Sequence, residues 1–96
     1  MELKDLRDQI DTIDNALLSF FIKRMQLTDE VAKLKKERGL AIYNAEREQE
    51  ILDWASRESG DLECYARLFF SCLFELSRSR QSQIISENRM IDNPEN

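Results

Sequence analysis

The chain has 96 residues, and 42% of them are hydrophobic, so a single small domain with its own core is expected, not a disordered chain. The net charge of −5 argues against a nucleic-acid or anionic-membrane surface, and neither kind of partner is expected. Two glycines and one proline leave few places for turns, which favours all-α structure, and the absence of histidine excludes histidine-based triads and Cys/His metal clusters. No metal and no cofactor are expected.

The first predicted element is a helix of about residues 2–38. Apolar residues recur every three or four positions, the spacing of a helix that packs along its length. We call these positions the apolar seam: Leu3, Leu6, Ile10, Ile13, Leu17, Phe20, Leu27, Val31 and Leu34. At ~1.5 Å per residue the helix is about 55 Å long, longer than the roughly 30 Å diameter of a compact globule of this size. A second copy of the chain is expected to cover the overhang, which predicts a homodimer.

Arg24 interrupts the seam between Phe20 and Leu27. A guanidinium among apolar residues is costly unless an anion or a hydrogen-bonding group meets it, so Arg24 is expected to face a small anionic ligand. Lys35, eleven residues later, returns to nearly the same side of the helix and can grip the other end of that ligand. Arg7 lies seventeen residues before Arg24, about 25 Å away, and can share the site only from an antiparallel second copy.

The rest of the chain predicts two more helices. Asn44 is a suitable N-cap for a helix of about 44–58, and Gly60 can end it. Asp61 can cap a third helix of about 62–87. We expect one helical domain over residues 1–90, followed by a polar tail, residues 91–96, that is a frayed end or the start of a linker.

Polar residues on these two helices share faces at helical spacing. Asn44, Arg47 and Glu48 lie at i, i+3 and i+4, and Ser77 and Gln81 lie at i and i+4. From the residues alone, the ordinary interpretation is a cap with a surface ion pair and two exposed polar side chains.

The expected compartment is the cytoplasm. Cys64 and Cys72 are too far apart on one helix for a disulfide, the N-terminus is charged from the start, and no apolar run is long enough to span a bilayer.

Taken together, the charged and apolar residues resemble the all-α chorismate mutase family, the AroQ class. The resemblance covers about residues 3–85, and it rests on pieces in a fixed order: Leu6-Arg7, then Ile10, Ile13 and Asp14; Lys23-Arg24; Lys35; Arg47-Glu48; and Ser77-x-x-x-Gln81. The family implies an intertwined homodimer of three-helix chains with two equivalent sites. The implied reaction is the rearrangement of chorismate to prephenate, in phenylalanine and tyrosine biosynthesis.

The resemblance also implies roles for single residues. Arg7 matches an arginine supplied across the interface, and Arg24 matches a second carboxylate-binding arginine. Lys35 and Gln81 match the pair that contacts the ether oxygen of the substrate. The remaining matches, to residues that hold the ring hydroxyl, the ring carboxylate or neighbouring charges, are Arg47, Glu48 and Ser77.

Two departures stand out, and two alternative functions stay open. Asn44 stands where many members carry an aspartate that accepts the ring hydroxyl, and Tyr43 stands where some members carry an arginine. The alternatives are an isochorismate-pyruvate lyase on the same scaffold and a helical dimerisation module without catalysis.

Overall fold

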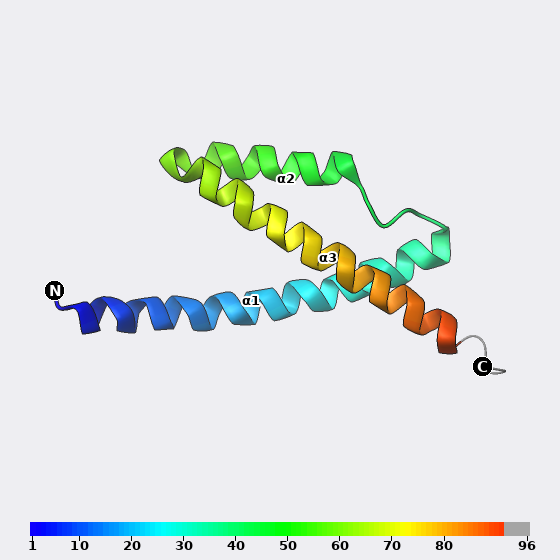
Figure 1. Cartoon of the computed structure of the whole chain (residues 1–96), viewed down its shortest axis with the longest axis horizontal. Helices are drawn as coiled ribbons and strands as arrows, with labels where there is room; N and C mark the ends of the chain where they lie inside the picture. Colours follow the sequence, from blue (N-terminus) through cyan, green and yellow to red (C-terminus); the bar gives the residue numbers. More distant parts are fainter. Residues whose placement is uncertain (92–96) are drawn as a thin grey trace.

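The computed structural model describes residues 1–91, and within them the fold is all-α, as predicted. Helix α1 spans Leu3–Arg38, α2 spans Ala45–Glu58, a 3-10 turn (η1) spans Gly60–Leu62, and α3 spans Glu63–Ile91. The described residues contain no strand. Helix α3 crosses the second half of α1, α2 packs on α3 away from α1, and the N-terminal end of α1 extends beyond both (Figure 1).

The predicted first helix matches α1 to within one residue, and local chemistry fixes both ends. The backbone N–H of Glu2 donates to the Asp5 carboxylate at 3.1 Å, which satisfies a donor at the helix start. At the other end Gly39 takes the left-handed conformation, φ 65°. The N–H of Gly39 then donates to the Lys36 carbonyl at 3.3 Å, and that of Leu40 to the Lys35 carbonyl at 2.8 Å. This pair of bonds is a Schellman motif, which turns the chain sharply out of the helix.

The second half of α1 packs on α3 through small and polar residues. Ala32 is fully buried and Thr28 nearly so, which brings the two helix backbones close together. Beside them Arg80 of α3 forms a two-point ion pair with Asp29 of α1: Nε to Oδ1 at 2.6 Å and Nη2 to Oδ2 at 2.9 Å. The hydrogen bonds from Arg80 hold the pKa of the Asp29 carboxyl below its usual value. These contacts fix the angle at which α3 crosses α1.

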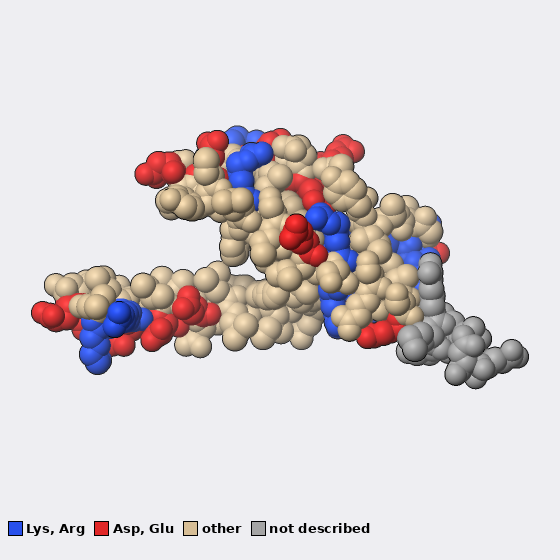
Figure 2. Space-filling view, viewed as in Figure 1, with Lys and Arg blue, Asp and Glu red and all other residues tan. Residues whose placement is uncertain are grey.

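The apolar seam stays largely exposed in the single chain. Leu17, Phe20 and Leu27 are 50%, 66% and 67% exposed, and residues 1–20 are exposed throughout. The radius of gyration is 17.6 Å, against roughly 12 Å for a compact domain of this length. In the space-filling view the first half of α1 stands apart as an arm, separated from the α2–α3 hairpin by open space (Figure 2).

Helix α2 packs on α3 but not on α1. The Asn44 carboxamide caps α2 as predicted, because its Oδ1 accepts the backbone N–H of Arg47 at 3.0 Å. At the far end, Trp54 meets the ring of Phe70 edge-on, with ring centroids 5.9 Å apart. The contact between α2 and α3 is therefore aromatic at one end.

The predicted join between the second and third helices is wrong in one detail. Asp61 does not cap α3 but lies inside η1, because Gly60, with φ 58°, tightens the chain into a 3-10 turn that leads directly into α3. Helix α3 also runs four residues beyond its predicted end at residue 87. The predicted polar tail begins at Ile91, still within α3, and residues 92–96 lie outside the described residues.

No helix in the described part of the chain is long and apolar enough to cross a membrane.

We predict that Gly39→Ala lowers the free energy of unfolding by about 1 kcal/mol, because an L side chain is strained at φ 65° while nothing lies near enough to clash with the added methyl group. Gly39→Asn is the matched control and costs less, since Asn tolerates this conformation. Urea denaturation of the three proteins measures the difference. Equal loss in both variants would contradict a backbone origin.

Candidate functional site

A pocket of about 280 Å³ lies where α1, α2 and α3 meet, and it gathers all the predicted site residues except Arg7. Those present are Arg24 and Lys35 from α1, Asn44, Arg47 and Glu48 from the start of α2, and Ser77 and Gln81 from α3. Arg24 and Gln81, which are 57 positions apart in the sequence, therefore line the same cavity. The apolar part of the wall comes from Leu27, Val31, Ile42, Ile51 and Phe74.

The α1 wall supplies two cations from one side of the helix. Arg24 is half-buried, and none of the described residues places a carboxylate in ion-pair contact with its guanidinium. Lys35 is also half-buried, and its Nζ donates to the backbone carbonyl of Ile42 at 2.5 Å. Burial lowers the pKa of Lys35 from its ordinary value, and the carboxylate of Glu48 acts in the opposite direction. The α1 wall thus holds positive charge that its own surroundings only partly compensate.

The α2 wall supplies a cap, a cation and a carboxylate. The Oδ1 of Asn44 accepts the backbone N–H of Arg47 and keeps a second lone pair. The Arg47 side chain reaches Glu50 at 3.2 Å on the exposed side of the helix. Glu48 is more buried, with its side chain 21% exposed, and is the one carboxylate among the described residues that line this pocket.

The α3 wall supplies neutral polar groups. Gln81 is 5% exposed, and its Nε2 donates to the hydroxyl of Ser77 at 3.2 Å. The Gln81 Oε1 is buried without a hydrogen-bond partner in the described structure. The Ser77 hydroxyl also lies 3.5 Å from that of Thr28, which in turn donates to the Arg24 carbonyl at 2.9 Å. Ser77 and Gln81 are therefore not the two exposed residues of the ordinary interpretation.

Sequence reasoning missed two pocket residues, Arg78 and Thr28. Arg78 directly follows Ser77, and its Nη1 lies 2.5 and 2.6 Å from the two carboxylate oxygens of Glu48. That pairing joins α3 to α2 and could not be read from spacing along one helix. Thr28 could have been found, because it lies four residues after Arg24 and seven before Lys35, on the same side of α1.

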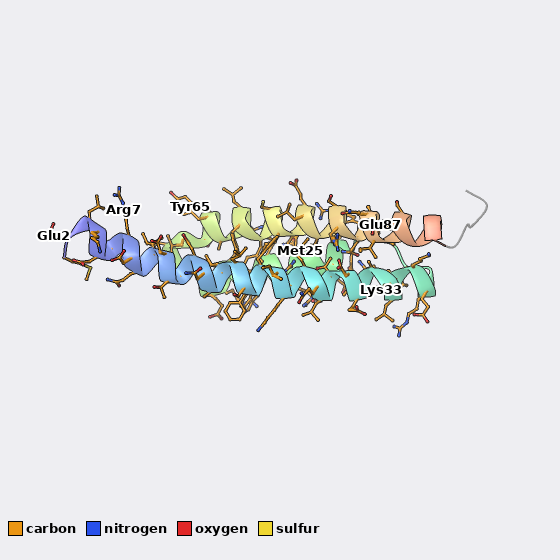
Figure 3. All side chains as sticks on the ribbon, turned by 90° about the horizontal axis from the view of Figure 1, so that it is seen from below. Glu2, Arg7, Met25, Lys33, Tyr65 and Glu87 are labelled. Atoms are coloured by element: carbon orange, nitrogen blue, oxygen red, sulfur yellow. The ribbon has the colours of Figure 1, made fainter. Side chains whose placement is uncertain are left out.

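Arg7 does not lie in the pocket of its own chain. It is exposed near the N-terminus of α1, close to Glu2 and at the opposite end of the helix from Lys33 (Figure 3). Seventeen helical residues separate it from Arg24, about 25 Å along the axis. A single chain therefore leaves Arg7 and the pocket apart, as the sequence predicts for a straight helix.

A second pocket of about 330 Å³ adjoins the first and shares Arg24, Arg47 and Ile51 with it. Its apolar wall comes from Ile51, Trp54 and Phe70. In the described residues no group of three or more Cys, Asp and Glu side chains is placed to hold a metal ion. The cations, the neutral donors and the apolar walls together define a site suited to a small organic anion.

Comparison with known proteins agrees with this chemistry. Residues 6–82 match the family model for type II chorismate mutase. The chain is 31% identical over 91 residues to a chorismate mutase of Methanocaldococcus jannaschii, covering 92% of each protein. A solved structure of a conserved hypothetical protein from Pyrococcus furiosus is 37% identical, with a TM-score of 0.69 over 82% of this chain and 93% of that one. The chain belongs to the type II chorismate mutase family, which confirms the predicted family.

Other relatives are much longer than this chain. A T-protein of Haemophilus influenzae is 50% identical over 46 residues, which are 48% of this chain but 12% of that protein. The chain thus spans a small part of some curated relatives and nearly the whole of the Methanocaldococcus jannaschii protein.

We predict that Glu48→Gln moves the titration of Lys35 to lower pH. The variant removes the carboxylate that favours the ammonium form, so the pKa of Lys35 falls further below its ordinary value and Lys35 loses its proton earlier as the pH rises. The carbon-13 resonance of Lys35 Cε, followed by NMR on the alkaline side of neutrality, measures this. Glu50→Gln is the control, because Glu50 pairs with Arg47 instead. An unchanged Lys35 titration in Glu48→Gln would refute the assignment.

Proposed function

We propose that this protein converts chorismate to prephenate, acting as a homodimer in which Arg7 of each chain completes the pocket of the other. The observation that carries the proposal is the half-buried Arg24, a cation with no carboxylate partner among the described residues, at the edge of a cavity that also holds Lys35. Chorismate is a dicarboxylate, and family membership supports it as the ligand.

The charges of the pocket match such a ligand. Arg24, Lys35, Arg47 and Arg78 contribute four positive charges, and Glu48 contributes one negative charge, so the lining carries +3. The whole chain carries −5, so attraction of a dianion is local to the pocket. Chorismate would bring two negative charges and leave little net charge in a partly desolvated site.

The reaction is an intramolecular rearrangement in which a C–O bond breaks as a C–C bond forms, so no proton has to move and no nucleophile is needed. The pocket has two tasks. The arginines fix the two carboxylates and hold the enolpyruvyl arm over the ring. Lys35 stabilises the negative charge that develops on the ether oxygen, and Gln81 donates with the second hydrogen of Nε2, the first being held by Ser77. Gln81 stays a donor at any ordinary pH, so no acidic medium is required.

The exposed surface of the single chain supports the proposed homodimer. The apolar seam is exposed along the arm, and so large an apolar surface is unusual in a monomer. An antiparallel second copy covers the seam and carries its Arg7 toward the pocket. A reducing compartment such as the cytoplasm suits the two free cysteines of α3.

The two alternatives explain less. A dimerisation module accounts for the seam but not for a pocket in which Arg24, Lys35 and Gln81 converge. An isochorismate-pyruvate lyase needs similar ligand contacts, and no residue of the described pocket favours it over the mutase. Product analysis with chorismate and with isochorismate decides between the two enzymes.

We predict that the purified protein consumes chorismate, followed by the loss of its absorbance, and that Lys35→Ala lowers kcat by about 10²-fold or more. The variant removes the charge that meets the ether oxygen. Lys35→Arg is the control, because it keeps a cation and retains more activity. Near-normal turnover in Lys35→Ala would reject this role for Lys35, and no turnover in the parent protein would reject the proposed function.

We also predict that inactive Arg7→Ala and Arg24→Ala proteins recover activity when they are mixed and allowed to exchange subunits. Each mixed dimer has one pocket with both arginines intact, and half of randomly formed dimers are mixed, so about a quarter of the parental sites return. Activity is measured before and after exchange.

The control for this experiment is a mixture of Arg7→Ala with the double variant Arg7→Ala/Arg24→Ala. No pocket in that mixture contains Arg7, so its activity stays at the level of the separate proteins. If the first mixture also stays inactive while mixed dimers are detected by mass spectrometry, Arg7 does not act across the interface.

A further inference from the structure

Arg78 is held between two neighbours on the wall of the main pocket. Its guanidinium carbon lies 5.3 Å from the centre of the Tyr43 ring, a cation–π contact. Its Nη1 contacts both carboxylate oxygens of Glu48, and this carboxylate raises the pKa of Arg78 above its ordinary value. Because the two contacts come from different elements, the position of the guanidinium is fixed. We call these three residues, Tyr43, Arg78 and Glu48, the Arg78 array.

The array holds the carboxylate of Glu48, the strongest hydrogen-bond acceptor among the described residues that line the pocket. The Oδ1 of Asn44 already accepts the backbone N–H of Arg47, and the Oε1 of Gln81 is fully buried. Glu48 is the one carboxylate among the described residues that line the pocket, and each of its oxygens keeps a lone pair after bonding to Arg78, so its charge makes it the strongest acceptor for a ligand hydroxyl. The chorismate dianion has a single hydrogen-bond donor, its ring hydroxyl. Chemical complementarity brings that hydroxyl to Glu48 and the ligand carboxylates to the arginines.

The charge of the array limits what Glu48 can accept. Arg78 neutralises the carboxylate at contact distance, and the positive charge of Lys35 also acts on Glu48. Asn44 adds none of the negative charge that an aspartate would bring. A neutral hydroxyl can donate to Glu48 there, whereas a protonated amine would meet a positive field.

We infer that the Arg78 array is a specificity device that selects a neutral hydroxyl at the ring position of the substrate and rejects a cationic amine. This inference rests on the proposed function for the choice of ligand. Arg78 and Tyr43 take the role of positioning residues, since they act through the carboxylate of Glu48.

The test compares chorismate with the analogue in which an amino group replaces the ring hydroxyl, protonated at neutral pH. The parent protein is expected to prefer chorismate by about 10²-fold in kcat/KM. Arg78→Met frees the Glu48 carboxylate to pair with the amine, so the preference shifts toward the analogue by about tenfold or more. Asn44→Asp adds a carboxylate and shifts the preference the same way; it also guards against misfolding, because Asp caps a helix as well as Asn does.

Arg80→Met is the matched control. Arg80 lies two residues from Arg78 on α3 but pairs with Asp29 outside the pocket, so its removal leaves the preference unchanged. Dissociation constants for both ligands, measured by calorimetry, give the same ratio without catalysis. Failure to turn over chorismate would therefore overturn the proposed function alone. The inference itself is overturned if the parent protein takes both ligands equally, or if Arg78→Met and Asn44→Asp leave the ratio unchanged.

Discussion

A half-buried guanidinium is stable only when an anion or several hydrogen-bond acceptors meet it, and the rest of the structure has to leave room for such a partner beside Arg24. Arg24 lies on the face of α1 that lines the pocket, between apolar residues of the seam, and no described carboxylate pairs with it. By contrast, the cation of α3 that helps to hold the fold together, Arg80, is fully paired with Asp29. The chain therefore separates a cation used for folding from a cation left available for a ligand.

In the proposed dimer, the same face of α1 would serve both association and ligand binding. Thr28 and Ala32 pack against α3, while the neighbouring seam residues Leu27 and Val31 line the pocket and stay partly exposed. Because these two sets lie side by side on one helix, a second chain laid along the seam would also form part of the pocket wall. In such an assembly the second chain would enlarge the small core of the single chain next to the pocket. A ligand bound there would then stabilise the dimer.

Most of the fold could be predicted from the sequence because it follows from local rules. Helical periodicity predicted α1, the cap at Asn44 predicted the start of α2, and Gly39 predicted the end of α1. The pairing of Arg78 with Glu48 could not be predicted, since it depends on the angle at which α2 meets α3, a property of packing and not of spacing. The error at Asp61 has a similar source: a capping residue was assigned from its type, whereas the turn at Gly60 decided the geometry.

The ion pair between Arg78 and Glu48 links stability to specificity. It spans two helices and is only partly exposed, so removing either partner would leave a partly buried charge unpaired, and its carboxylate also lines the proposed ligand pocket. A free carboxylate there would repel a dianion, and an unpaired arginine would leave the site without an acceptor for a hydroxyl. Pairing Arg78 with Glu48 in the pocket wall avoids both outcomes. Arg78, which Tyr43 holds in place, cancels the charge of the carboxylate, and each carboxylate oxygen keeps a lone pair for a hydroxyl.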